Sequence, residues 1–419
     1  MKDLITLCKD SKIASVSLLS VSQQAINKTL TDCANLIRQN KLFLQQENNI
    51  DIENAKNKGL SLAFIDRLSL TDKVIEGIAV GIEQVATLTS PVGNVLYSFS
   101  DNEQGFSLQK RAVPFGVIGI IYESRPNVTA DAFALCFKTS NAVILKGGSD
   151  SINSNKAMVK VIKQALEMNG IDQNAVTLIE DTSRQTTAEF MKMNKYVDLL
   201  IPRGGALLIK TAVENSTIPI IETGTGNCHV YVDKFADVDK AVKIIFNAKT
   251  QRYSVCNACE SIVIHSAILE SALPKIANAL LEKKVEIRAD ERAYKVLADY
   301  PYLAKATDQD FYTEYGDAII SVKTVDDVAQ AIAHINEHST KHSESIVTEN
   351  EQNASAFLTA IDSACVYHNA STRFSDGFQF GLGAEIGIST QKLHARGPMG
   401  LEALVTYKFM VKGNGAVRK

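Results

Sequence analysis

The sequence predicts an α/β protein with two doubly wound domains and a separate β-hairpin arm. Between residues 117 and 221, continuous apolar segments alternate with segments of helical periodicity, as in a buried parallel sheet with its crossover helices. A second alternation of the same kind begins at Asn227. Between Val95 and Leu108, two loosely alternating segments flank a polar turn at 101–105, which indicates a hairpin.

Length and composition exclude several classes of protein. A chain of 419 residues has room for two or three domains and a substantial core. The net charge of −3 provides no basic field, so we expect neither nucleic-acid binding nor attachment to a membrane surface. The longest apolar run, 113–121, is too short to span a bilayer, and Asp3 and Lys9 interrupt any secretory signal. We therefore expect a cytoplasmic protein, in which seven scattered cysteines remain reduced.

Helices are predicted from about residue 20 to residue 88. Apolar side chains recur there with a period near 3.6 residues, for example at Ile26, Leu30, Cys33 and Ile37. Thr71-Asp72 is typical of a helix start, and Pro91-Val92-Gly93 ends the region. The hairpin that follows has a polar tip, so it either faces solvent or adds to the sheet of a partner.

Two strand ends of the first sheet carry residues suited to binding. The predicted strands are 117–122, 142–145, 176–179, 197–201 and 218–221, and the predicted helices are 130–139, 155–169, 186–193 and 207–215. Lys146 directly follows the second strand, and Gly204-Gly205 follows the fourth. Ligands of doubly wound sheets bind at the carboxyl ends of the strands, so we expect both at a binding edge.

The second domain is predicted to alternate in the same way. Its strands are 228–232, 261–265, 318–322, 345–348 and 364–367, and its helices are 237–248, 269–283 and 324–338. A charged stretch, 283–310, is interpreted as a separator without strands. A glycine-rich run, 377–387, and an extended strand, 404–411, complete the chain.

Cys256 is the candidate nucleophile. The thiolate is the reactive form of cysteine, and a helix start or a nearby cation favours it. We expect a first helical turn at Asn257, and Arg252 adds positive charge. The alternative for Cys256 is a small buried side chain, as for most free cysteines. Cys256 and Cys259 also form a Cys-x-x-Cys motif, which admits a redox or zinc interpretation, although no second ligand pair at metal spacing is evident. We predict no metal.

Several motifs together carry a family resemblance. They are Pro114–Gly119, Glu123–Thr129, Ile201–Gly205, Glu222–His229, Val255–Asn257, Arg373–Phe378, Phe380–Gly387 and His394–Leu401. The spacing of Lys146, Glu222, Cys256 and Glu314 resembles the aldehyde dehydrogenase superfamily. More closely, the chain resembles the γ-glutamyl phosphate reductase family, also called glutamate-5-semialdehyde dehydrogenase, nearly from end to end.

The resemblance implies an activity and an architecture. It implies NADPH-dependent reduction of L-glutamyl 5-phosphate to L-glutamate 5-semialdehyde and phosphate through a cysteine thioester, the second step of proline synthesis. It implies a cofactor-binding domain over 1–225, including the hairpin arm 95–111, and a catalytic domain over 226–390. Segment 391–419 then returns and supplies an arm strand for a homo-oligomer. No kinase-like segment is present, so a separate glutamate 5-kinase would supply the substrate.

The resemblance also implies roles for individual residues. Cys256 is the nucleophile, and Asn127 donates a hydrogen bond to the developing oxyanion, together with the Cys256 backbone N–H. Glu222 stands where hydrolytic relatives have a general base; here we expect it to orient groups, because water would destroy the thioester.

Cofactor and substrate residues follow from the same resemblance. Lys146 would contact the adenosine ribose or the 2′-phosphate of NADP, Glu314 the nicotinamide ribose, and Gly204 and Gly205 the pyrophosphate. Arg125, Arg252 and Arg396 are candidates for the substrate phosphate or carboxylate, because guanidinium pairs with both. Tyr253 departs from the family, which commonly has proline there. The alternatives are a hydrolytic or CoA-acylating aldehyde dehydrogenase, or a Cys-x-x-Cys redox protein.

Overall fold

The computed structural model describes residues 3–101, 103–123 and 125–418. The described chain divides into two compact units. Unit 1 comprises the residues up to Glu222, Leu382–Gly387 and the residues from Met399 onward; unit 2 comprises Thr223–Gly381 and Ile388–Pro398. The domains predicted from the sequence are three continuous segments, 1–225, 226–390 and 391–419.

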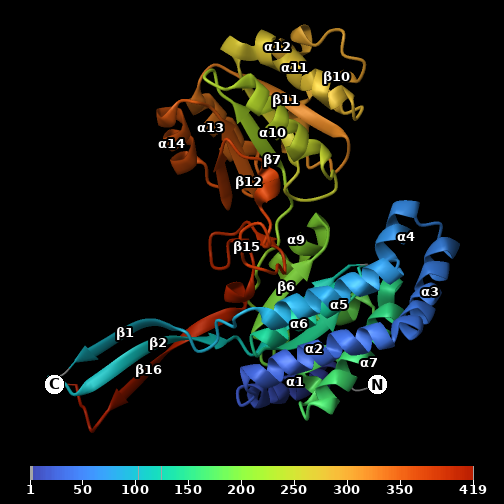
Figure 1. Ribbon diagram of the computed structural model, residues 1–419, viewed down its shortest axis with the longest axis vertical. Helices are drawn as coiled ribbons and strands as arrows, with labels where there is room; N and C mark the ends of the chain where they lie inside the picture. Colours follow the sequence, from blue (N-terminus) through green and yellow to red (C-terminus); the bar gives the residue numbers. More distant parts are fainter. Residues whose placement is uncertain (1–2, 102, 124, 419) are drawn as a thin grey trace. The chain divides into compact units, whose positions relative to one another are not determined.

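Five helices begin unit 1 (Figure 1). They are α1 (Leu4–Leu18), α2 (Gln23–Gln39), α3 (Lys41–Asn57), α4 (Leu62–Leu68) and α5 (Asp72–Thr87). The side chain of Thr71 accepts the N–H of Val74 and caps α5, as its sequence predicts. The prediction of helices from about residue 20 to residue 88 is confirmed by α2 to α5, whereas α1 precedes the predicted range. The buried face of α1 includes Ser11, Ala14 and Ser15, so it lacks the apolar period on which the prediction depends.

The first sheet is parallel, as predicted. It contains β3 (Val117–Tyr122), β4 (Ala142–Lys146), β5 (Val176–Leu178) and β6 (Leu199–Arg203) in the order β5-β4-β3-β6. The intervening helices are α6 (Asn127–Lys138), α7 (Ile152–Met168), α8 (Arg184–Phe190) and α9 (Ala206–Asn215). The order reverses between β3 and β6, so the loops after these two strands border the switch point where such sheets bind ligands.

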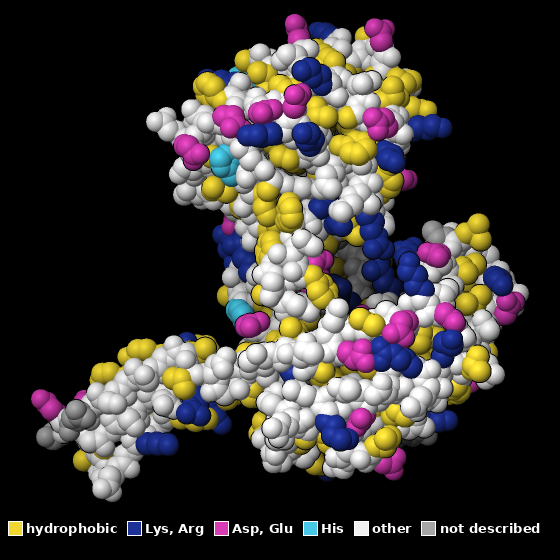
Figure 2. All heavy atoms as spheres, viewed as in Figure 1, with side chains coloured by type: hydrophobic (Ala, Val, Ile, Leu, Met, Phe, Trp, Pro, Cys, Tyr) yellow, Lys and Arg dark blue, Asp and Glu magenta, His cyan; other side chains and the backbone are white. Residues whose placement is uncertain are grey.

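The arm is a three-stranded antiparallel sheet (Figure 1). β1 (Val95–Asp101) pairs with β2 (Phe106–Pro114), and β2 pairs on its other side with β16 (Val405–Gly413). The predicted hairpin and the predicted terminal strand therefore lie together. Apolar side chains remain exposed on both outer strands; they are Val95, Leu96, Tyr97, Phe99, Tyr407, Phe409 and Val411. Figure 2 shows hydrophobic side chains on the visible face of the arm.

Unit 2 is built on a seven-stranded parallel sheet in the order β10-β9-β11-β8-β7-β12-β13. Its strands are β7 (Cys228–Val232), β8 (Cys259–His265), β9 (Glu286–Ala289), β10 (Leu303–Lys305), β11 (Ile319–Val325), β12 (Ser343–Val347) and β13 (Cys365–His368). Its helices are α10 (Val238–Thr250), α11 (Leu269–Leu281), α12 (Glu291–Val296), α13 (Val328–His338) and α14 (Glu351–Ala360). A small hairpin, β14 (Ile388–Ser389) and β15 (Gly397–Pro398), belongs to the same unit.

The charged stretch 283–310 is not a separator, because it contains β9, α12 and β10. In β9, Ile287 and Ala289 are buried while Glu286 and Arg288 are half-buried. The strand has only four residues, and two of them are charged, so its alternation is too short to stand out from the sequence. Within the described residues, no helix combines the length and the apolar character needed to cross a membrane.

Candidate active site

Cys256 lies in a turn between α10 and β8. The N–H of Ala258 donates to the carbonyl of Val255 at 3.0 Å and closes this turn. The predicted helix start at Asn257 is wrong: the chain enters β8 at Cys259, because the apolar run that follows pairs with β7 and β11 on both sides. Cys256 is half-buried, and the other six cysteines are buried, so Cys256 is the thiol most accessible to a reagent or a substrate.

The turn lies at the amino edge of the second sheet, since β8 begins after it. In unit 1, Lys146 ends β4 and Gly204 follows β6, so both lie at the carboxyl edge, as predicted. Ligands of doubly wound sheets are expected at the carboxyl ends of the strands. In unit 2 the candidate nucleophile lies at the opposite edge, so the rule does not locate it.

Close backbone contact fixes the Cys256 turn from one side. A Cβ atom added to Gly226 would lie 1.4 Å from the carbonyl oxygen of Cys256, so only glycine fits there. The N–H of Gly226 donates to Glu314 Oε1 at 2.8 Å. The thiol of Cys228 donates to the Cys256 carbonyl at 3.2 Å. Gly226, which lies in the motif Glu222–His229 and has no role assigned from the sequence, is thus a contact residue of the candidate nucleophile.

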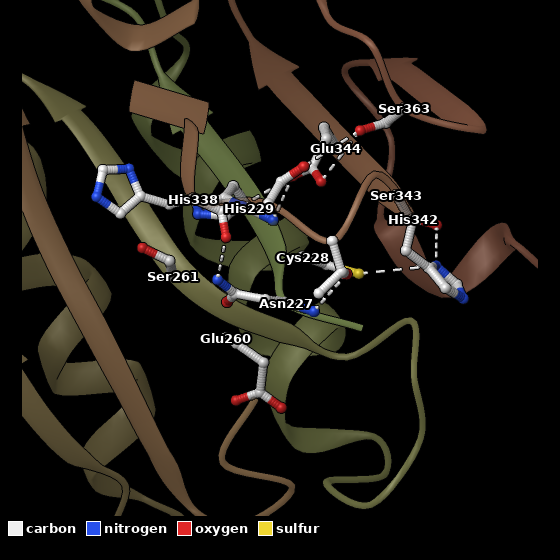
Figure 3. A network of polar contacts seen from close by, with 12 residues as sticks. Asn227, Cys228, His229, Glu260, Ser261, His338, His342, Ser343, Glu344 and Ser363 are labelled. Carbon is white, nitrogen blue, oxygen red and sulfur yellow. Dashed lines mark hydrogen bonds and ion pairs between the residues drawn. The ribbon is translucent and has the colours of Figure 1, made fainter. Parts of the chain in front are cut away.

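A buried polar network continues from Cys228 along the amino ends of β7 and β12 (Figure 3). Cys228 Sγ lies 3.8 Å from His342 Nδ1, which lies 2.8 Å from Ser343 Oγ. His229 Nδ1 lies 3.0 Å from Glu344 Oε2, and both side chains are fully buried. Burial raises the pKa of Cys228 well above its ordinary value and lowers the pKa of His342 to about 4. At neutral pH, Cys228 is therefore a protonated donor and not a second nucleophile.

Lys249 and Glu260 form a fully buried ion pair close to the turn in sequence. Lys249 Nζ donates to Glu260 Oε2 at 2.6 Å, and the N–H of Gly316 donates to Glu260 Oε1 at 3.2 Å. Burial raises the pKa of Glu260 to about 7, and Lys249 acts in the opposite direction. The pair ties α10 to the start of β8, the two elements that flank the Cys256 turn. Sequence inspection gives no signal for it, since the partners are eleven residues apart on different elements.

Cys259 is a core residue of β8. Its side chain is fully buried, and its thiol donates to the Ser261 carbonyl at 3.3 Å. Burial raises the pKa of Cys259 to about 12. Among the described residues, no group of three or more His, Cys, Asp or Glu side chains is arranged to hold a metal ion.

Lys146 is a nearly buried cation at the carboxyl edge of the first sheet. Among the described residues, the hydrogen bond recorded for its Nζ is a long one of 3.4 Å to the Gly147 carbonyl. Burial lowers the pKa of Lys146, and the charge of Asp181 opposes this effect. Asp150, the nearest acid after the strand in sequence, pairs with Lys58 at 2.7 Å. The edge thus presents an ammonium group whose hydrogen bond within the described part of the chain is long, and the adjacent acid Asp150 is paired with Lys58.

Gly204 and Gly205 lead into α9, as predicted. Gly205 is the N-cap residue, and a Cβ atom added to Gly204 would lie 2.6 Å from the carboxyl carbon of Glu123. The N–H of Gly205 donates to Glu123 Oε2 at 3.2 Å. The start of this helix therefore already binds an anionic group, the carboxylate of its own chain, as helix N-termini do.

Asn127 and Arg125 follow β3 in unit 1. Asn127 begins α6, and its side-chain amide donates to Asp131 at 3.0 Å. Burial raises the pKa of Asp131 to about 6, against this hydrogen bond and the charge of Arg203. Arg125 is exposed in the same loop. Glu222 is half-buried and is the last residue of unit 1 before the chain enters unit 2.

The remaining candidates belong to unit 2. Glu314 is exposed and reaches the Cys256 turn through the N–H of Gly226. Arg252 is exposed four residues before Cys256. Arg396 pairs with Asp362 at 3.0 Å, and this carboxylate also binds Lys341 and Lys392. Within unit 2, the structure therefore brings Glu314 to the nucleophile turn and pairs Arg396 with a carboxylate that two lysines share.

The two parallel-sheet units, the antiparallel arm and the accessible thiol are the features of a chain of the aldehyde dehydrogenase class. A model of the aldehyde dehydrogenase family matches residues 18–296. Gamma-glutamyl phosphate reductase of Agathobacter rectalis is 55% identical over 420 residues and covers 100% of both chains. The chain belongs to the γ-glutamyl phosphate reductase family, whose enzymes serve proline biosynthesis.

Solved structures agree with this assignment. The crystal structure of gamma-glutamyl phosphate reductase from Thermotoga maritima is 44% identical, with a TM-score of 0.97, and the match covers 100% of both chains. An acetylating aldehyde dehydrogenase from Geobacillus thermoglucosidasius is 16% identical, with a TM-score of 0.68, over 100% of both chains. This second likeness concerns the fold alone.

Proposed function

We propose that the chain reduces L-glutamyl 5-phosphate to L-glutamate 5-semialdehyde and phosphate, with NADPH as hydride donor and Cys256 as nucleophile. The observation that carries this proposal is the position of Cys256, a half-buried thiol in a turn that Gly226 and Cys228 fix, while the other cysteines are buried. A separate glutamate 5-kinase is the proposed source of the acyl phosphate.

In the proposed reaction, the Cys256 thiolate attacks the acyl carbon, and phosphate leaves with the bonding electrons to give a thioester. NADPH, when bound, supplies the hydride that reduces the thioester carbon. The resulting oxyanion re-forms the carbonyl, the carbon–sulfur bond breaks, and Cys256 leaves as a thiolate while the aldehyde departs. We assign Asn127 and the backbone N–H of Cys256 to stabilise the oxyanion, and Glu222 to orient groups without activating water.

We assign binding of the cofactor phosphates to residues of unit 1, and the nucleophile belongs to unit 2. Lys146 suits a cofactor phosphate, because it is a nearly buried ammonium whose hydrogen bond to the Gly147 carbonyl is long, and Asp150 nearby in sequence is paired with Lys58. Gly204 and Gly205 are assigned to the pyrophosphate, which would displace the Glu123 carboxylate from the start of α9. Glu314 is assigned to the nicotinamide ribose.

Arg125, Arg252 and Arg396 remain the proposed partners of the substrate phosphate or carboxylate. Arg252 is exposed and close to Cys256 in sequence, and Arg125 is exposed in the loop after β3. Arg396 shares Asp362 with Lys341 and Lys392, so three cations surround one carboxylate, and the cluster keeps an excess of positive charge.

The experiment that tests the function is the reverse reaction. With L-glutamate 5-semialdehyde and NADP⁺, we expect cofactor reduction that requires inorganic phosphate. Reduction that proceeds equally without phosphate would indicate a hydrolytic aldehyde dehydrogenase, and reduction that requires coenzyme A instead would indicate an acylating one. Either result would overturn the proposal.

Replacing Lys146 with alanine is expected to raise the KM for NADPH about tenfold or more, because a charge-assisted hydrogen bond to phosphate is lost. The KM for NADH should rise less, since NADH lacks the 2′-phosphate. Lys156→Ala is the matched control, because Lys156 is exposed and pairs with Glu180 at 2.7 Å. Equal increases for both cofactors would show that Lys146 does not bind the 2′-phosphate.

We propose that the arm forms a homo-oligomer contact. β1 and β16 are the edges of its sheet, and such edges with exposed apolar side chains favour strand pairing with another chain. Deleting residues 407–419, most of β16, should shift the protein toward monomer in light scattering. Deleting only 414–419, beyond β16, should leave the oligomer intact. A native oligomer after the longer deletion would refute this role.

A further inference from the structure

Arg373 lies against both ends of the segment that carries Cys256. It belongs to the short loop after β13, and its side chain is half-buried. Its Nε donates to Gln251 Oε1 at 2.9 Å, and its Nη1 donates to Asn257 Oδ1. Gln251 precedes Cys256 by five residues, and Asn257 follows it directly. A single guanidinium group therefore bridges the two sides of the nucleophile turn.

The same loop fixes Asn257 by further hydrogen bonds. Asn257 Nδ2 donates to the Ser375 carbonyl at 2.8 Å, and Thr372 Oγ1 donates to the Asn257 carbonyl at 2.7 Å. Asn257 is only 5% exposed. These hydrogen bonds fix both the side-chain amide and the backbone of Asn257. The hydrogen bond from Arg373 therefore reaches a rigidly placed residue that directly follows Cys256.

Arg373 also places a positive charge near the thiol. Burial lowers the pKa of Arg373, and the Cys256 thiolate acts in the opposite direction. An electrostatic interaction is reciprocal. Because the Cys256 thiolate stabilises the charged guanidinium of Arg373, the guanidinium also stabilises the thiolate. Asp376, Arg252 and Cys228 are further charged or titratable groups that act on Arg373. Arg252 adds to the positive charge, and Cys228 remains a neutral thiol.

We propose that Arg373 is a positioning residue for the nucleophile: its guanidinium bridges Gln251 and Asn257, fixes the Cys256 turn, and holds Cys256 as the thiolate. The inference deepens the proposed function, because it gives Cys256 its reactive form. It assigns a role to an arginine outside the three substrate candidates. Arg373 acts through Cys256 and needs no contact with the substrate.

Alkylation of Cys256 by iodoacetamide measures the thiolate without any turnover. The other six cysteines are buried, so brief labelling of the folded protein should mark the Cys256 peptide in mass spectra, with Cys256→Ala as the blank. For Arg373→Gln, the alkylation rate near pH 7 should fall about tenfold, and the rise of the rate with pH should shift to higher pH, because a neighbouring cation is lost.

Arg373→Lys separates charge from geometry. Lysine keeps the positive charge but lacks the planar fork that bridges two acceptors. We expect near-native alkylation with a kcat about tenfold below that of the native protein. Arg292→Gln is the matched control. Arg292 also belongs to unit 2, where it pairs with Asp326 at 2.6 Å, and its replacement by glutamine removes one positive charge, as Arg373→Gln does. It should alkylate at the native rate.

Native alkylation of Arg373→Gln over the whole pH range would overturn the proposal, as would an equal fall in Arg292→Gln. If Arg373→Gln does not fold, the pH profile of Arg373→Lys decides: loss of the native profile despite the retained charge contradicts the electrostatic part. A shifted alkylation profile in a protein without phosphate-dependent activity would refute the proposed function and leave this inference intact.

Discussion

Cys256→Ala is expected to abolish phosphate-dependent turnover, with a loss of about four orders of magnitude or more, because no thioester can form. Binding of NADPH, followed by cofactor fluorescence, should remain close to native, since the residues proposed for the cofactor phosphates belong to unit 1. The loss is expected in kcat, not in cofactor affinity.

Cys259→Ala is the matched control for this variant. Cys259 is a buried residue of β8 whose thiol bonds within its own strand, so its replacement should leave most of the activity. A modest loss of stability is expected from the small cavity. Equal loss of activity in the two variants would mean that the Cys-x-x-Cys pair, and not Cys256 alone, is the functional unit.

Lys249→Met is expected to have the largest effect on stability. It leaves the Glu260 carboxylate buried without its cation, and breaking one side of a buried ion pair costs about 3–5 kcal/mol of unfolding free energy. For a unit of this size, the thermal midpoint should fall by about 10 °C in a melting experiment. Lys249→Met combined with Glu260→Met should recover much of this loss, because a well-packed apolar pair replaces both charges.

The pH dependence of this effect has a definite sign. The pKa of Glu260 is about 7 in the folded protein, above its ordinary value of 4.5, so folding takes up a proton at this group. The contribution of Glu260 to the free energy of unfolding is therefore fully present below its ordinary pKa of 4.5. This contribution is lost as pH rises through about 7. The deficit of Lys249→Met should shrink as pH is lowered, because protonation removes the buried charge. A deficit that is constant with pH, or no deficit, would contradict a buried charged pair.

The two parallel sheets and the arm could be predicted from the sequence, because buried parallel strands appear as continuous apolar runs. The first helix, α1, could not, because its buried face uses serine and alanine. β9 and β10 could not either, since they have four and three residues and contain charges. In each case the element is stabilised by neighbours that are distant in sequence.

The local structure around Cys256 was not predictable from the adjacent residues. The apolar run 261–265 is predicted as a strand, but the strand begins two residues earlier, at Cys259, and Asn257 lies in a turn before it instead of in a first helical turn. Cys256 itself and the two strand-end motifs of unit 1 were identified from their positions and the family motifs. Contacts such as Gly226 with Cys256, or Arg373 with Asn257, join residues many positions apart, and the sequence carries no signal of their proximity.

In the proposed reaction, Cys256 carries the acyl group as a thioester. The most direct test is to mix the protein with L-glutamate 5-semialdehyde and NADP⁺ without phosphate, quench in acid, and map adducts by peptide mass spectrometry. We expect a glutamyl group on the Cys256 peptide that disappears when phosphate is added before the quench. An unmodified Cys256 peptide, or a glutamyl group on another residue that phosphate discharges, would contradict it.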